Sequence, residues 1–216
     1  MKNLAKKFLT EEEQQKITET VQRMEKLTSG EIVPMVVSTS HDYPVAKAIG
    51  AGLLTLPLAL LLTSITGSYL WLGPQNMWLF LAYASIFYFP LYKLVGSNPP
   101  IMRLFLLARQ VEEEVEEAAV SAFYNEGLYR TRQENGILVF ISVLEKKVWV
   151  LGDRGINERV GPNEWQDIIK ELSEGIRDDQ QCEAICRSIT RIGNVLRHHF
   201  PIQEDDHDEL HNIIIR

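Results

Sequence analysis

The segment 152–158 reads Gly-Asp-Arg-Gly-Ile-Asn-Glu and sets acids beside a guanidinium group, directly after a β-rich run. Strand ends are where open α/β sheets place ligand-binding groups. Asp153 could coordinate a hard divalent cation, Ca²⁺ or Mg²⁺, while Arg154 could hold a phosphate group. The ligands predicted for such a cation are Asp153, Glu134, Asn135 and Glu158. The segment therefore predicts either a catalytic site at Asp153 and Arg154, or an ordinary turn in which the aspartate binds backbone N–H groups and the arginine pairs with a nearby acid.

A second group that could bind an anion is Arg130-Thr131-Arg132, which lies between a helical pattern and a β-rich run. The guanidinium groups of Arg130 and Arg132 could face a phosphate near Asp153. Alternatively, they cap the carbonyl groups of the preceding helix end or contact lipid headgroups. The spacing leaves both interpretations open.

Cys182 and Cys186 lie four residues apart on one face of a predicted helix, and His198 and His199 follow. A zinc site needs four converging ligands, whereas two thiols on a single helix are typical of a buried face. We therefore interpret both cysteines as core residues. The sequence also contains no phosphate-binding loop, GxGxxG, HExxH or nucleophile elbow, so nucleotide and metalloprotease chemistry lack their usual support.

The elements that must position these groups alternate between helical and β-rich patterns. Thr10–Glu13 is a capping box that starts an amphipathic helix, and this helical pattern stops at Ser29-Gly30. The other predicted elements are β-rich runs at 31–39, 136–142 and 147–152, and helices at 107–125, 162–172 and 179–198.

The order of these elements predicts a small mixed-sheet α/β sandwich with helices on the sheet. A long crossover joins the first two β-rich runs and favours a parallel pair, whereas the short link 143–146 predicts an antiparallel hairpin. Pro34 fits an edge position or a bulge better than a strand centre. Because 47 residues cannot bury a core alone, we expect 1–47 and 96–201 to form one discontinuous domain, followed by an acidic tail at 202–216.

The stretch between the two halves of that domain has a different composition. The chain has 216 residues and a net charge of -7, yet every charged residue lies outside Ala48–Tyr92. Since a membrane span needs about 20 apolar residues, the stretch 48–95 predicts a transmembrane helical hairpin. Its spans are expected at about 48–66 and 77–95, with a turn at Gly73–Asn76. A purely soluble protein and a basic nucleic-acid-binding protein are excluded.

Positive charge gathers beside the open end of the predicted hairpin, at Lys47, Lys93, Arg103 and Arg109. The segment 67–76 at the turn carries no charge. By the positive-inside rule, both termini of a two-pass membrane protein with this pattern lie in the cytoplasm.

Three segments resemble the TPM-domain family, named after a thylakoid lumen protein, a photosystem II repair protein and an acetylcholine-receptor modulator. They are Phe123–Leu128 (Phe-Tyr-Asn-Glu-Gly-Leu), Asn135–Ser142 (Asn-Gly-Ile-Leu-Val-Phe-Ile-Ser) and Gly152–Ile156 (Gly-Asp-Arg-Gly-Ile). The similarity is closer to the bacterial membrane branch of the family, whose motif matches Gly136 at the strand start, Glu145 in the hairpin and Gly155 at the strand exit.

This resemblance implies a protein of the bacterial inner membrane that binds, assembles or maintains other membrane proteins. Members of the wider family are described as acid phosphatases, calcium binders and assembly or repair factors. The resemblance therefore also implies an alternative function, a metal-assisted phosphatase that acts on phosphate esters at the membrane surface. The predicted partners are the lipid bilayer and a membrane protein, while the oligomeric state and the question of catalysis stay open.

Overall fold

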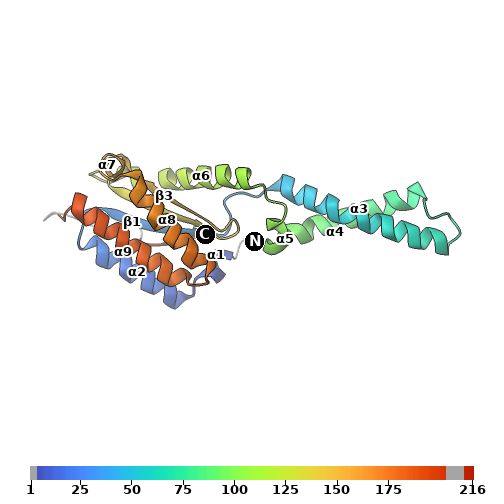
Figure 1. Ribbon diagram of the computed structural model, residues 1–216, viewed down its shortest axis with the longest axis horizontal. Helices are drawn as coiled ribbons and strands as arrows, with labels where there is room; N and C mark the ends of the chain where they lie inside the picture. Colours follow the sequence, from blue (N-terminus) through green and yellow to red (C-terminus); the bar gives the residue numbers. More distant parts are fainter. Residues whose placement is uncertain (1–3, 203–211) are drawn as a thin grey trace. The chain divides into compact units, whose positions relative to one another are not determined.

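The computed structural model describes residues 4–202 and 212–216, which form two compact units (Figure 1). One unit, called the helical unit below, comprises Asp42–Val111. The other, called the α/β unit, comprises the described residues up to His41 together with Glu112–Arg216. Most of the predicted acidic tail, 203–211, lies outside the described residues.

The helical unit contains two long apolar helices that pack against each other. These are α3 (Pro44–Tyr69) and α4 (Met77–Ser97), and the short α5 (Pro99–Arg103) follows them. Both long helices extend beyond the predicted spans, and they are long and apolar enough to cross a membrane. Asn76 caps α4 because its side-chain oxygen accepts the N–H groups of Trp78 and Leu79 at 3.0 and 3.1 Å.

Small side chains make the buried face of α3. Beyond the first turns of the helix, the buried residues recur at every fourth position and are Ala51, Thr55, Ala59, Thr63 and Gly67. Residues four apart lie on one helix face, so they form a continuous strip. At Gly67 an added Cβ would lie 2.2 Å from the carbonyl oxygen of Gly73, so the close approach of the turn requires glycine there. The uncharged composition of the stretch gave no indication of this strip.

The α/β unit is built around a four-stranded sheet in the order β3-β2-β1-β4. Its strands are β1 (Glu31–Val37), β2 (Gly136–Ser142), β3 (Lys147–Gly152) and β4 (Ile214–Ile215). β1 pairs in parallel with β2, from Glu31 opposite Gly136 to Val37 opposite Ser142, and β2 pairs antiparallel with β3. The predicted parallel pair, the predicted hairpin and the mixed α/β fold class are confirmed.

Helices cover both faces of this sheet (Figure 1). They are α1 (Leu4–Phe8), α2 (Glu11–Glu25), α6 (Ala108–Asn125), α7 (Arg154–Asn157), α8 (Pro162–Arg177) and α9 (Gln181–His199), with a 3-10 turn at Leu128–Arg130. The Thr10 hydroxyl and the Glu13 carboxylate form the predicted capping box of α2. The helical end after α6 is confirmed as well, because Gly127 takes a φ of 76°, which favours glycine.

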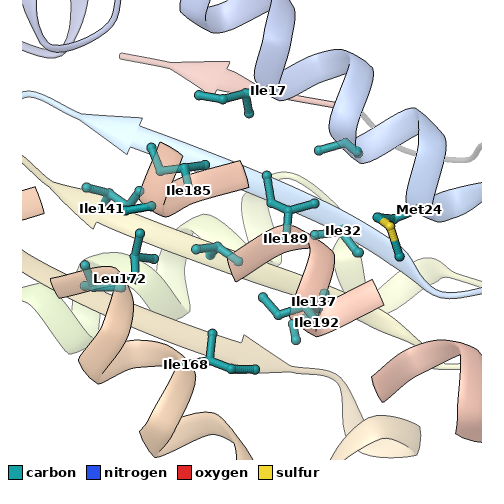
Figure 2. Packing of buried hydrophobic residues seen from close by; sticks show 14 of the residues in the cluster. Ile17, Met24, Ile32, Ile137, Ile141, Ile168, Leu172, Ile185, Ile189 and Ile192 are labelled. Carbon is teal, nitrogen blue, oxygen red and sulfur yellow. The ribbon is translucent and has the colours of Figure 1, made fainter. Parts of the chain in front are cut away.

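The main core lies where α2, α8 and α9 meet one face of the sheet (Figure 2). Ile32 of β1 and Ile137 and Ile141 of β2 point into it, and they meet Ile185 and Ile189 of α9. All five are essentially inaccessible to water. The alternate residues Leu138 and Phe140 face the other side, toward α6, and are buried too. Burial on both faces explains why β2 is an uninterrupted apolar run.

β4 was not expected from the sequence. Ile214 and Ile215 pair in parallel with Met35 and Val36 of β1, so the last residues of the predicted tail belong to the sheet. This pairing also explains Pro34. The Val36 carbonyl accepts the Arg216 N–H at 2.9 Å, so the backbone groups of even-numbered β1 residues face the β4 side. The missing N–H of Pro34 therefore points away from β2 and interrupts no bond of that ladder. Because β1 lies between β2 and β4, the edge position predicted for Pro34 is wrong.

Candidate functional site

Asp153 lies between the end of β3 and the start of α7. Its N–H donates to the Gly136 carbonyl at 2.9 Å, which fixes the residue at the end of the β2–β3 pair. One carboxylate oxygen, Oδ1, accepts the Arg154 N–H at 2.7 Å and caps α7. Aspartate is favoured at this position because the first N–H groups of a helix have no partner inside it. Half of the carboxylate therefore has a structural role.

The second oxygen of Asp153, Oδ2, is in a different situation. It is inaccessible to solvent and has no hydrogen-bond partner within the described residues 4–202 and 212–216. A carboxylate oxygen removed from water without a partner is unfavourable. Of the atoms around α7, Oδ2 is thus the best suited to accept a hydrogen bond from a ligand or to coordinate a cation.

A cavity of about 450 Å³ adjoins this aspartate. It lies between α6, the end of β3 and α7, and its lining residues are Val120, Phe123, Tyr124, Leu151, Gly152, Asp153, Arg154, Asn157 and Glu158. The aromatic rings of Phe123 and Tyr124 supply an apolar wall opposite the charged groups. These two rings were not predicted as site residues, and the available signal was a pair of aromatics on an otherwise acidic helix. A cavity that combines apolar walls with a few charged groups is typical of a small-molecule or side-chain pocket.

Arg154 is paired with Glu158. Its Nε donates to Glu158 Oε1 at 2.8 Å, and both side chains are exposed. This hydrogen bond, followed by the charges of Glu158 and Glu134, raises the pKa of Arg154. The guanidinium group keeps its charge beside Asp153, but Glu158 is occupied by the arginine.

Glu134 and Asn135 lie in the turn that precedes β2. Glu134 has a φ of 51°, and its carbonyl oxygen would lie 2.8 Å from a Cβ added at Gly155, so the turn and α7 are in close contact. Glycine at 155 is required by this contact, in keeping with its place in the family motif. Asn135 is buried, and its side-chain amide donates to the Ser29 carbonyl while its N–H donates to Thr131 Oγ1 at 3.0 Å. Asn135 thus joins the turn to the segment before β1.

Gly136, the first residue of β2 in the family motif, is also required by a close approach. A Cβ added there would lie 2.5 Å from the Leu128 carbonyl oxygen.

Arg130 and Arg132 are exposed and are not among the residues that line the cavity beside Asp153. The Arg130 Nε donates to the Tyr129 hydroxyl at 3.0 Å, and its guanidinium lies 5.3 Å from the centre of that ring. The structure brings Asp153, Arg154 and Glu158 together in one cavity, whereas the two arginines lie outside it.

A three-ligand cation site is not formed by these acids. Within the described parts of the chain, no three His, Cys, Asp or Glu side chains converge in a way that could hold a metal ion. Asp153 caps α7, Glu158 pairs with Arg154, and Glu134 acts on Arg154 through its charge, so the three acids serve different partners. The Ca²⁺ or Mg²⁺ site stays a prediction.

Comparison with known proteins addresses the family of this chain. The sequence model of the TPM domain matches residues 103–195, a range that contains the whole cavity. This part of the chain is similar to the TPM domain. The resemblance noted in Phe123–Leu128, Asn135–Ser142 and Gly152–Ile156 is confirmed, whereas assignment to the membrane branch stays a prediction.

One solved structure is similar to this chain in fold. The NMR structure of the BA42 protein from the psychrophilic bacterium Bizionia argentinensis has a TM-score of 0.59 and 21% sequence identity to this chain. The similarity covers 96% of this chain and 94% of that one. No curated protein matches the chain.

Glu145 lies at the opposite end of the β2–β3 hairpin from Asp153. With a rise of about 3.3 Å per residue along β3, Glu145 cannot reach Arg154. Its Oε1 accepts the Thr39 hydroxyl at 3.1 Å and the Ser40 N–H at 2.9 Å, and its Oε2 accepts the Ser142 hydroxyl. The glutamate of the TPM motif therefore connects the hairpin turn to the segment that leaves β1.

The sheet topology also bears on the prediction of a ligand site at Asp153, which rested on its position directly after a strand. β3 runs antiparallel to β2, so its carboxyl end lies beside the amino ends of the parallel strands β1 and β2. The rule that places ligands at strand ends concerns the carboxyl ends of parallel strands. In the TPM domain that edge holds Glu145, and Asp153 lies at the other edge.

Cys182 and Cys186 are free thiols on the face of α9 that meets α2. Cys182 is buried, its Sγ lies 3.9 Å from the Glu13 carbonyl oxygen, and the Thr20 hydroxyl lies 3.6 Å from Cys186 Sγ. Burial, and then the nearby Cys186, raise the pKa of Cys182 to about 11. A thiol with this pKa is a poor nucleophile and metal ligand at neutral pH, which agrees with the interpretation of a core residue.

Proposed function

We propose that this TPM-domain protein is anchored in the bacterial inner membrane by α3 and α4, and that its α/β unit binds other proteins at the cytoplasmic surface. One observation carries the anchor: the helical unit exposes its large apolar side chains. Of the most apolar window of each helix, only 28% is buried in α3 and 6% in α4. A core helix of a soluble protein would bury most of this surface.

The exposed residues are those that lipid would cover. Leu60 and Phe89 are 60% and 75% exposed, while the small residues of α3 are buried. In water each large apolar side chain left exposed forgoes about 1.5–3 kcal/mol of burial. In lipid this cost disappears, and helices associate instead through small residues that allow close packing. The pattern of the helical unit fits lipid as its solvent.

The ends of the two helices support an orientation. Trp71 and Trp78, at the turn, are 96% and 81% exposed, as expected for rings at a membrane interface. Lys47, Lys93 and Arg103 lie toward the other ends of the helices. The positive-inside rule then favours a cytoplasmic position for both termini and for the TPM domain.

Membrane insertion and orientation are tested together by cysteine labelling in intact cells. In a background with Cys182→Ala and Cys186→Ser, single cysteines are introduced as Gln75→Cys in the turn and Glu164→Cys on α8. A membrane-impermeant maleimide should label Gln75→Cys from outside and Glu164→Cys only after permeabilisation. Extraction of the protein by alkaline carbonate, without detergent, would contradict the anchor.

The binding role is supported by how the predicted ligand and motif residues are used in the fold. Glu145 accepts three hydrogen bonds from neighbouring segments, Glu158 pairs with Arg154, and Asn135 is bonded to Ser29. These groups hold the fold together. Binding to a partner needs only an accessible surface, which the domain offers.

The alternative is a metal-assisted phosphatase, and one observation favours it. Asp153, whose Oδ2 has no partner within the described residues, lines the same cavity as Arg154. There Asp153 would contribute to holding a cation that polarises a phosphate ester, and Arg154 would steady the charge of the phosphate group.

Catalysis is tested with the detergent-solubilised protein and a generic phosphate ester, with and without Mg²⁺ or Ca²⁺. Hydrolysis that needs the cation and is lost in Asp153→Asn, but not in the exposed control Glu117→Gln, would establish the phosphatase. Equal inactivity of all three folded proteins would leave the binding role as the better proposal.

A further inference from the structure

The outer edge of β3 is available for pairing with another strand. β3 is the first strand in the sheet order β3-β2-β1-β4, so only one of its edges is bonded within the described sheet. The Asp153 N–H bonds the Gly136 carbonyl, and bonded pairs alternate along an antiparallel ladder. The N–H and C=O groups of Val148 and Val150 therefore point outward.

The Gly152 carbonyl group also points outward, away from β2. The carbonyl oxygen of Gly152, two residues beyond Val150, accepts a hydrogen bond from the Asn157 side chain at 2.7 Å. The last outward position of β3 is thus covered by α7, whereas Val148 and Val150 lie where β3 faces a groove. The edge that stays available is short and sharply bounded.

The groove has a volume of about 380 Å³ and follows β3 between two helices. Glu112 and Val115 of α6 form one wall, and Ile169, Ser173 and Arg177 of α8 form the other. Its floor is the apolar segment Val148-Trp149-Val150. A strand edge between two helical walls has the form of the sites at which some domains add an extended peptide to their own sheet.

The charges along the groove select the chemistry of the peptide. Lys146, Lys147 and Arg177 line it against the single acid Glu112, whose Oε1 lies 3.7 Å from Lys147 Nζ. The chain as a whole carries a net charge of -7, so an acidic partner would be repelled by most of the protein but attracted here. The apolar floor requires apolar side chains at alternate positions of the same peptide.

We propose that the groove along β3 binds an extended acidic segment of a partner protein, which adds to the sheet as a fifth strand next to Val148 and Val150. The proposal rests on the proposed function, because it names the surface through which the anchored TPM domain binds its partners. Backbone hydrogen bonds to β3 supply affinity, and Lys146, Lys147 and Arg177 supply the preference for acids.

The test measures binding of a labelled peptide of alternating Glu and Val to the full-length protein in nanodiscs, by fluorescence anisotropy. Two matched peptides serve as probes of mechanism: one with Lys in place of Glu, and one with N-methyl groups on the amides that would face β3. We expect the acidic peptide to bind, and each matched peptide to bind at least about tenfold more weakly. Raising the salt concentration should weaken binding of the acidic peptide.

Two substitutions examine the edge itself. Val150→Pro removes an N–H that points outward, which an edge strand tolerates, and should weaken peptide binding about tenfold. Val150→Thr keeps the N–H and a similar shape and should bind like the wild type. Arg177→Glu should lower affinity for the acidic peptide and raise it for the Lys peptide. The N-methylated peptide gives the same information without any substitution, so a poorly folded Val150→Pro would not prevent the test.

The proposal is overturned if the acidic and Lys peptides bind equally, if N-methylation has no effect, or if no peptide binds. Association of the wild type with itself that Val150→Pro abolishes would overturn it in favour of a second copy as occupant. Other results would contradict the proposed function: extraction of the protein by carbonate, or labelling of Glu164→Cys from outside the cell. Peptide binding is measured on purified protein and is unaffected by either result.

Discussion

The helical unit and the α/β unit bury opposite kinds of side chain. In the α/β unit, large apolar residues such as Ile137, Ile189 and Leu196 are inaccessible, and among the described residues Glu31 is the one buried charged residue. In the helical unit, Ala59 is inaccessible while Leu60, the next residue, is 60% exposed. Water drives large apolar groups inward, whereas lipid does not, and packing between helices in lipid selects small groups. This difference is the one expected if, as proposed, lipid and not water surrounds the helical unit.

Removing a large side chain should therefore have very different effects in the two units. Ile189→Ala, in the core of the α/β unit, should lower the free energy of unfolding by about 2–5 kcal/mol, because it leaves a cavity. Leu60→Ala, on the exposed face of α3, should change it by no more than about 0.5 kcal/mol. Urea unfolding of the full chain in detergent, followed by hydrogen exchange of each unit, checks both values. A large loss in Leu60→Ala would mean that a protein surface, and not lipid, covers that face.

Enlarging a small side chain should have its larger effect in the helical unit, the reverse of the order expected for removing a large one. Ala59→Leu inserts bulk into the packed strip between α3 and α4 and should destabilise the helical unit by about 1–3 kcal/mol. We expect faster hydrogen exchange in α3 and α4 while the α/β unit keeps its protection. Leu60→Ile is the matched control, since it changes shape on the exposed face of the same turn. Unchanged exchange in Ala59→Leu would contradict close packing along the strip.

The two ends of the β2–β3 hairpin offer a second comparison, between a carboxylate with all its partners and one with a free oxygen. Glu145 accepts hydrogen bonds on both oxygens, so Glu145→Ala removes the acceptor of the Ser40 N–H and of the buried Ser142 hydroxyl and should cost about 1–3 kcal/mol of stability. Glu145→Gln keeps one acceptor and should cost less. Urea unfolding measures both, with Glu117→Ala on the exposed face of α6 as control. A loss in Glu145→Ala no greater than in the control would remove the structural role of this motif residue.

The fold could be predicted from the sequence where local signals were strong. The strands 136–142 and 147–152 are bounded by glycine and by a short turn, and both bounds agree with the structure. The connection lengths then determined which pairs run parallel. β4 was missed because two isoleucines after an acidic stretch carry little signal, and their pairing with Met35 and Val36 depends on contacts between distant parts of the chain.

Only the part of the candidate site that consists of residues close in sequence could be predicted. Asp153, Arg154 and Glu158 are close in sequence, and the structure places them in one cavity. Phe123 and Tyr124 come from another element, so no spacing in the sequence indicated that they form the opposite wall. Ser29 and Thr39, which bond Asn135 and Glu145, are likewise more than a hundred residues away from them, and the chemistry of each residue type alone did not reveal that they are structural.

The smallest effect on stability is expected at Asp153. Its two carboxylate oxygens can be examined separately, which makes the comparison with Glu145 at the other end of the hairpin more precise. Asp153→Ala removes the cap of α7 and should lower stability by about 1 kcal/mol. Asp153→Asn can still accept the Arg154 N–H, so it should cost only a few tenths of a kcal/mol while it removes the negative charge from Oδ2. Urea unfolding separates the two variants. If binding of a cation or phosphate ester at the cavity is lost in both, the charge of Oδ2 is required; if only Asp153→Ala loses it, the cap alone is needed to keep α7 in place. Equal stability of all three proteins would contradict the capping role, since the free oxygen would then be the only reason for an aspartate at this position.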